Sequence, residues 1–244
     1  MKALLFALLL VLCAGAQARS DDSNAACDKA RAVIADLGRI VTPRGLQKTF
    51  KLRIGGVDQW IYVRGQDAGN PILLFVHGGP ASPMSAAMWE FQRPLEEYFT
   101  VVHWDQRGAG RTYLASDPEA IRDTIHIARY VSDTIEVAEA IAREYHKAKV
   151  ILVGHSWGTV LGMKAALARP DLFYAYVGIG QVINTRTNER LSFEYGLEQA
   201  RKMHNEAAVK ELESIAPYPG DKPITRDRII IARKWPQHYG GLSA

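Results

Sequence analysis

The clearest indication of the fold is the stretch Val150-Ile151-Leu152-Val153-Gly154-His155-Ser156-Trp157-Gly158-Thr159. Its apolar first half predicts a buried strand, and the run from Thr159 to Ala168, stopped by Pro170, predicts a helix. Between them lies the pattern G-x-S-x-G, in the strand-to-helix setting that presents a serine hydroxyl as a nucleophile. Glycine is expected two positions before and after the serine, because a strained turn brings these positions against neighbouring chain. Ser156 is therefore the predicted catalytic nucleophile.

A second glycine loop, His77-Gly78-Gly79-Pro80, directly follows the apolar run 72–76. Acyl transfer develops negative charge on a carbonyl oxygen, which needs two preorganised N–H donors. We expect these donors to be the backbone N–H groups of Gly79 and Trp157. His77 sits at a strand end, and the base is the last triad member in the chain order of such a site. His77 and Gly78 are therefore interpreted as support for the loop rather than as catalytic groups.

A third segment, Trp104-Asp105-Gln106-Arg107-Gly108-Ala109-Gly110-Arg111-Thr112, follows the apolar run 100–104. Asp105 and Arg107 carry opposite charges and are expected to pair and brace this loop. The segment is predicted to form part of the pocket wall, with a role in holding the shape of the site.

The rest of the chain continues the alternation of strands and helices. The runs 50–54 and 59–64 flank Gly55-Gly56 and predict a hairpin, and 174–179 predicts a sixth strand. Apolar residues from Val131 to Tyr145 recur with helical spacing. Alternating strands and helices predict an α/β fold with a mainly parallel sheet. From Asn184 onward the patterns are helical, so we expect a core over 19–183 and a helical cap over 184–244.

The first 18 residues have the features of an export signal. Lys2 precedes an apolar run from Ala3 to Leu12, and Ala16-Gln17-Ala18 fits a cleavage site. A lipoprotein signal built on Cys13 ranks lower, because Leu12 stands where a small residue is expected. The apolar run is too short to span a bilayer comfortably. The prediction is an exported protein, periplasmic or secreted, whose mature chain keeps the single cysteine Cys27.

Composition excludes several function classes. The 244 residues are 48% hydrophobic and 23% charged, which fits a globular chain with a sizeable core. The net charge is +4, but the basic residues are scattered, so a nucleic-acid partner is not expected. The His, Cys and carboxylate residues lack the spacing of metal ligands, and we expect no metal or other cofactor.

Together, the three motifs resemble the proline iminopeptidase branch of the α/β-hydrolases. That branch shows H-G-G-P-G, then W-D-Q-R-G-x-G-x-S, then G-x-S-W-G-x, and the resemblance runs from Phe50 to Gln181. Two departures are Ala81 in place of the last glycine of the first motif and Thr112 in place of a serine. The resemblance implies the α/β-hydrolase fold and a small peptide or ester substrate.

The resemblance also implies strands and site residues that this sequence does not clearly contain. It implies an eight-stranded sheet with an acid after the seventh strand and a histidine after the eighth. Only six strands and a partial cap are recognisable here, so a truncated chain without the triad acid and histidine is expected. The residues of these types in the tail, none of which follows an apolar strand, are Asp221, Asp227, His204 and His238. The branch binds the substrate amine through cap carboxylates, to which Glu189 and Glu194 could not be matched.

Three functions follow as hypotheses. The first is a serine hydrolase, with a prolyl aminopeptidase as the leading subclass. The second is an exported esterase or lipase-like enzyme, and the third a catalytically dead remnant or binding protein. Haloalkane dehalogenase chemistry is disfavoured, because it uses a carboxylate where this chain has Ser156.

Overall fold

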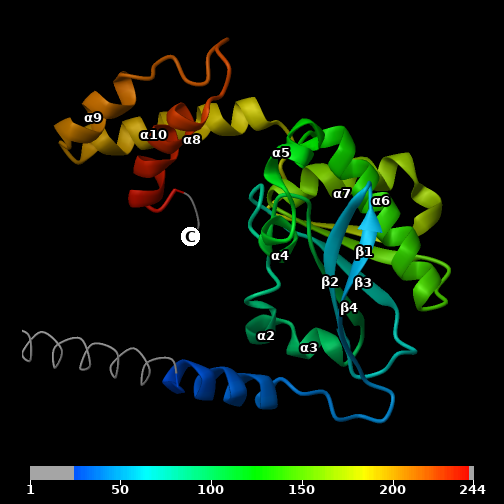
Figure 1. Ribbon diagram of the computed structural model, residues 1–244. Helices are drawn as coiled ribbons and strands as arrows, with labels where there is room; N and C mark the ends of the chain where they lie inside the picture. Colours follow the sequence, from blue (N-terminus) through cyan, green and yellow to red (C-terminus); the bar gives the residue numbers. More distant parts are fainter. Residues whose placement is uncertain (1–24, 242–244) are drawn as a thin grey trace, which may run out of the picture.

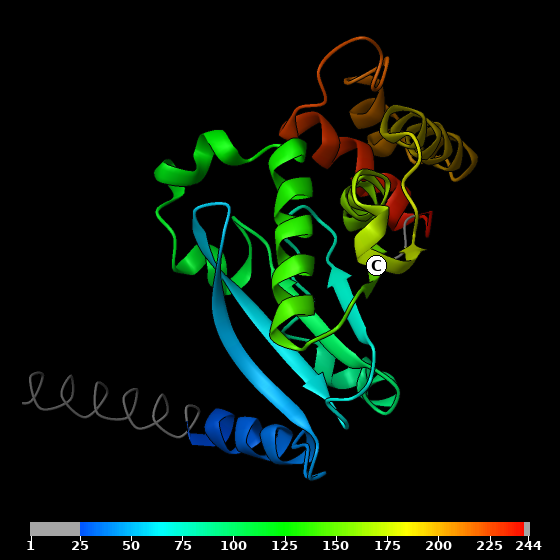
Figure 2. The same ribbon diagram turned by 90° about the vertical axis from the view of Figure 1, so that its right-hand side faces the viewer.

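The computed structural model describes residues 25–241. The expected export signal over 1–18 lies outside this range. A helix over residues 25–37 comes first, and it lies at the opposite end of the molecule from the C-terminal helices in both views (Figures 1 and 2). Within the described residues, the helices are all too short or too polar to cross a membrane.

A single sheet organises the core. Its six strands are β1 (Leu46–Ile54), β2 (Val57–Gly65), β3 (Ile72–Val76), β4 (Thr100–Asp105), β5 (Val150–His155) and β6 (Phe173–Ile179). Their spatial order is β1-β2-β4-β3-β5-β6. The pairs β1–β2 and β2–β4 are antiparallel, whereas β4, β3, β5 and β6 run parallel. The predicted hairpin, the six predicted strands and the mainly parallel sheet are confirmed.

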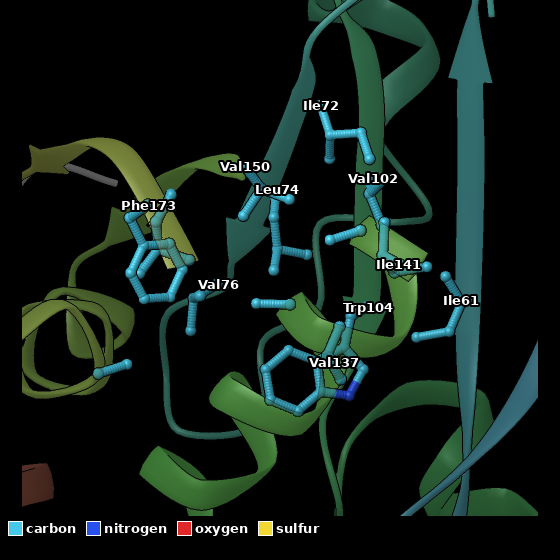
Figure 3. Packing of buried hydrophobic residues seen from close by; sticks show 14 of the residues in the cluster. Ile61, Ile72, Leu74, Val76, Val102, Trp104, Val137, Ile141, Val150 and Phe173 are labelled. Carbon is cyan, nitrogen blue, oxygen red and sulfur yellow. The ribbon is translucent and has the colours of Figure 1, made fainter. Parts of the chain in front are cut away.

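Strand β3 shows why the centre of the sheet reads as an unbroken apolar run. All five of its residues are buried. Ile72, Leu74 and Val76 join the larger core, which also contains Val137 and Ile141 of a covering helix (Figure 3). Leu73 and Phe75 belong to a second cluster on the opposite face. Because successive side chains point to opposite faces, a strand covered on both sides must be apolar throughout.

Helices cover both faces. The helices of the core are α2 (Met88–Phe91), α3 (Arg93–Glu96), α4 (Gly110–Leu114), α5 (Pro118–Ile121), α6 (Ile127–Glu144) and α7 (Trp157–Ala168), with 3-10 turns η1 (Arg122–Thr124) and η2 (Pro170–Leu172). Helices α6 and α7 pack against each other on the face of the larger core, where Leu161 and Ala165 of α7 are buried. Leu95 of α3 packs on the other face.

Strand β6 is an edge of the sheet as described, because it pairs only with β5. Five of its seven residues are exposed, and Tyr174 keeps 63% of its surface. The chain leaves β6 through Gly180, which has a positive φ of 60°.

The C-terminal helices form a separate layer at one end of the sheet. They are α8 (Thr185–Lys202), α9 (Glu206–Glu213) and α10 (Arg226–His238), and they lie together in both views (Figures 1 and 2). They enclose a small core of their own, formed by Phe193, Ala200, Ala208, Leu212, Tyr218 and Ala232. We call this layer the cap.

Candidate active site

Ser156 occupies the turn between β5 and α7. Its φ of 51° and ψ of −119° lie in a region that residues with a Cβ rarely adopt. Three hydrogen bonds fix this conformation. The N–H of Ser156 donates to the Ile179 carbonyl at 2.8 Å, and the Ser156 carbonyl accepts from the N–H of Thr159 at 2.9 Å and from its hydroxyl at 2.6 Å. A strained backbone held by its surroundings is a common feature of functional sites.

The two glycines that flank this turn are sterically required. A Cβ on Gly154 would lie 2.7 Å from the Gly158 carbonyl oxygen, and one on Gly158 would overlap the Val76 carbonyl oxygen. These are the close approaches expected from the sequence. Gly78 is constrained in the same way, because a Cβ there would lie 3.0 Å from the Cβ of Ser156. The loop after β3 therefore lies directly against the serine.

His77 braces that loop through both ring nitrogens. Nδ1 donates to the Gly78 carbonyl at 2.9 Å, and Nε2 accepts from the N–H of Gln106 at 3.2 Å. The Gln106 side chain donates to the His77 carbonyl at 3.1 Å. Burial lowers the pKa of His77, which keeps the ring neutral as this pattern requires. Both nitrogens are thus engaged by backbone groups, which favours a structural role.

Asp105 holds the same loop from the other side. Its buried carboxylate accepts from the hydroxyls of Ser85 at 2.7 Å and Tyr62 at 2.9 Å, and from the N–H of Arg111 at 2.8 Å. Burial and the neighbouring Asp105 raise the pKa of Tyr62 to about 12, so its phenol stays protonated and donates. Because Ser85 follows the glycine loop, Asp105 links that loop to β2 and β4.

The predicted pairing of Asp105 with Arg107 is wrong. Arg107 pairs with Asp133 of α6, with Nε at 2.5 Å and Nη2 at 2.9 Å from the carboxylate oxygens. Its remaining N–H groups donate to Thr124 and to the Gly55 carbonyl. The chain turns after β4, so Asp105 faces the glycine loop, where three donors satisfy it, and Arg107 faces α6.

A cavity of about 200 Å³ opens beside Ser156. It is lined by Gly79, Pro80, Ser156, Trp157, Val160, Val182, Thr185, Asn188, Glu189, Ile224, Ile229 and Arg233. The predicted nucleophile and both predicted oxyanion donors therefore share one cavity, and residues of the cap form part of its wall. A larger hollow of about 560 Å³ between α8 and α9 contains none of these residues.

Glu189 is a functional candidate that the sequence analysis left unassigned. Its side chain is 3% exposed, and it accepts from the Tyr218 hydroxyl at 2.8 Å and pairs with Arg233 of α10. Burial and the Glu189 carboxylate raise the pKa of Tyr218. A signal was present in the sequence: Glu189 occupies the buried stripe of α8 that continues with Phe193, Gly196 and Ala200. A carboxylate in such a stripe needs a partner or a ligand.

The remaining titratable candidates lie elsewhere. Glu194 pairs with Arg190 on the exposed face of α8 at 2.7 Å. Residues Asp221, Asp227, His204 and His238 are exposed, and the cavity lining includes none of them. Among the described residues that line this cavity there is no histidine.

Comparisons with known proteins agree with this architecture. A family model described as the alpha/beta hydrolase family matches residues 73–233. A probable aminopeptidase of Bacillus subtilis is 41% identical over 145 residues, which cover 59% of this chain and 45% of that protein. An epoxide hydrolase of Caballeronia sordidicola is 29% identical over 157 residues, covering 64% and 43%. The chain thus spans less than half the length of these curated relatives.

A solved structure shares the fold. A proline iminopeptidase-related protein of Thermus thermophilus superposes with a TM-score of 0.53 at 20% identity, covering 80% of this chain and 67% of that one. At this identity the similarity concerns the arrangement of the backbone.

Proposed function

The chain belongs to the alpha/beta hydrolase family, and we propose that it is a serine hydrolase acting as an aminopeptidase. The observation that carries the proposal is the shared cavity. Ser156, in a strained turn, lines it together with Gly79, Trp157 and a buried carboxylate, Glu189. A nucleophile, oxyanion donors and a charged recognition group are three of the parts that such an enzyme needs, and a proton acceptor is the fourth.

In the proposed reaction, the Ser156 hydroxyl oxygen attacks the substrate carbonyl carbon. The carbonyl oxygen becomes an anion, stabilised by the N–H groups of Gly79 and Trp157 at the positive end of α7. The amine then leaves with a proton, and water hydrolyses the resulting acyl ester on Ser156. The Ser156 proton passes to a base, and the described residues that line the cavity include no histidine that could take this role.

The identity of residue 156 favours acyl transfer over epoxide opening. Attack of a serine oxygen on an epoxide carbon would give an ether, which water does not readily cleave. Attack on a carbonyl gives an ester, which water can hydrolyse to regenerate the enzyme. The hydroxyl therefore supports the aminopeptidase or esterase alternative over the epoxide hydrolase one.

Glu189 and the size of the cavity support the aminopeptidase. A buried carboxylate in the same cavity as the nucleophile can bind the ammonium group of a free N-terminus. The rest of the cavity wall includes four apolar residues, Val160, Val182, Ile224 and Ile229. The volume of about 200 Å³ is below the roughly 300–1,000 Å³ of pockets for drug-sized ligands, which favours a small group such as one amino-acid residue. A short acyl ester would use the apolar wall but not the carboxylate, so the esterase is the alternative to test.

A fluorophosphonate probe tests the nucleophile. We expect one-to-one labelling that disappears in Ser156→Ala and persists in Ser132→Ala, a matched change on α6. Both variants should keep the wild-type circular dichroism spectrum. Folded wild-type protein that takes no label would contradict the proposal and favour a non-catalytic binding protein.

Two substrates then separate peptidase from esterase. Prolyl-naphthylamide carries the amine, whereas a short acyl ester lacks it. Glu189→Gln should raise KM for the naphthylamide by at least about tenfold, because a bond to a charged group is lost. The same variant should leave the ester unaffected. Faster turnover of the ester than of the naphthylamide in wild-type protein would favour the esterase.

We also propose that the protein is exported, on the basis of Lys2, the apolar run 3–12 and the small residues before Arg19. The test is a fusion of residues 1–24 to a reporter enzyme that is active only when its disulfides form. Because disulfides form outside the reducing cytoplasm, an exported fusion should show reporter activity. A fusion beginning at residue 19 is the control. Equal activity from both fusions would contradict export.

A further inference from the structure

The Glu189–Arg233 pair joins two cap helices inside the cavity that holds Ser156. Glu189 lies on α8 and Arg233 on α10, and both line that cavity. The Glu189 side chain is 3% exposed, whereas the Arg233 side chain is 47% exposed. Tyr218 hydrogen-bonds to the second carboxylate oxygen. The cavity thus holds a buried anion whose counter-ion is half in solvent.

Glu189 and Arg233 differ in the free-energy cost of losing their ion-pair partner. A buried carboxylate without a counter-ion is strongly unfavourable, so Glu189 needs a cation whenever the cavity is empty. A half-exposed guanidinium can be rehydrated at little cost. A carboxylate has about four acceptor positions, and the two partners fill one on each oxygen. A second cation can therefore approach Glu189 while Arg233 is leaving.

We propose that Arg233 is a displaceable counter-ion that competes with the substrate ammonium for Glu189. This inference rests on the proposed aminopeptidase function and names a residue that sets the affinity of its site for the substrate amine. An ammonium group replaces Arg233 charge for charge, so Glu189 keeps a cation throughout. An uncharged acyl group offers no such exchange and leaves the pair closed. Arg233 thereby lowers the affinity for amines and leaves the affinity for neutral acyl groups unaffected.

Binding of two matched probes tests the inference without turnover. L-prolinamide carries a ring ammonium, and cyclopentanecarboxamide has a CH₂ at the same position. At pH 6.5 the amine is protonated, because an α-amine has a pKa of about 8. Calorimetric titration of the full chain should show that Arg233→Gln lowers Kd for prolinamide by about tenfold. The affinity for cyclopentanecarboxamide should stay unchanged.

Further variants separate competition from general effects. Arg233→Lys keeps the competing charge and should bind prolinamide like wild-type protein. Arg190→Gln removes the exposed partner of Glu194 on the same helix and should also have no effect. The double variant Glu189→Gln with Arg233→Gln should not show the tighter prolinamide binding expected of Arg233→Gln alone. Unchanged or weaker prolinamide binding in Arg233→Gln, or an equal gain for the neutral amide, overturns the inference.

A measurement on wild-type protein covers the case in which Arg233→Gln does not fold. The Nε–H resonance of Arg233 should shift as prolinamide is added and stay in place with cyclopentanecarboxamide. If the Arg233 resonance does not shift when prolinamide saturates the site, Arg233 is not displaced from Glu189. Because neither measurement needs catalysis, failure of fluorophosphonate labelling would count against the proposed function and not against this inference.

Discussion

Arg107 and Asp133 form an ion pair at 2.5 Å in which both side chains are fully buried. Arg107 follows β4 and Asp133 lies in α6. The same carboxylate also accepts from Gln59 of β2 at 3.0 Å and from Arg129 at 2.8 Å. The pair therefore joins the loop beside the candidate site to a covering helix and to the antiparallel part of the sheet.

Breaking this pair should be costly. Asp133→Asn would leave the Arg107 guanidinium buried without a counter-charge, so we expect the free energy of unfolding to fall by about 3–5 kcal/mol. Urea denaturation followed by circular dichroism would measure the change. Glu119→Gln breaks the exposed pair with Arg122 and should cost less than about 0.5 kcal/mol. Similar losses in the two variants would contradict the assignment.

Gly158 should not tolerate a methyl group. A Cβ there would overlap the Val76 carbonyl oxygen, which belongs to a buried central strand and cannot move freely. We expect Gly158→Ala to lower the free energy of unfolding by at least about 3 kcal/mol. In Gly56→Ala the added Cβ meets open space, and only the positive φ of 78° costs about 1 kcal/mol. The crowding argument fails if the two variants prove equally stable in urea.

The predictions for Gly158 and for the Arg107–Asp133 pair differ in whether the sequence pattern near each residue could reveal its environment. The flanking glycines of Ser156 and the apolar run of β5 are neighbours in sequence, so their periodicity and steric requirements predict the turn. The partner of Arg107 lies 26 residues away, beyond the reach of any local pattern. Sequence proximity favoured Asp105, but the turn after β4 separates the two side chains.

Glu189 shows the same limit for the site. The α/β fold, the six strands and the helical cap could be predicted, because each follows from a repeating pattern of apolar residues. Which cap residues line the cavity that holds Ser156 depends on how α8 and α10 pack in the folded chain. The sequence analysis left Glu189 unassigned, and only the folded chain brings it to the cavity and pairs it with Arg233.

His103 should make the protein sensitive to acid. It is buried in β4 with its ring centroid 4.8 Å from that of Phe75, and burial lowers its pKa to about 3. The unfolded chain takes up the proton near pH 6.5 while the folded chain does not. The stabilisation from neutral His103 is therefore present above pH 6.5 and is lost as the pH falls toward 3.

The expected contribution is a loss of about 2 kcal/mol between pH 7.5 and 5. His103→Phe keeps a ring against Phe75 but cannot titrate, so its stability should fall less over the same interval. Urea midpoints of both proteins at the two pH values measure the difference. Parallel losses in wild-type protein and His103→Phe would exclude His103 as the cause.

The backbone of Ala81 is strained, and a glycine at this position would remove the strain. It stands where the resembled motif has glycine, and its φ is 64°, in the left-handed region. That region costs a residue with a Cβ roughly 1–2 kcal/mol, while glycine adds about 0.5–1 kcal/mol of unfolded-state entropy. Ala81→Gly should therefore raise the free energy of unfolding by about 0.5 kcal/mol. Ala87→Gly is the matched control in the same connection, because Ala87 has a φ of −108° and gains no relief. If Ala81→Gly is destabilised as much as Ala87→Gly in urea, the left-handed backbone at residue 81 is not a source of strain.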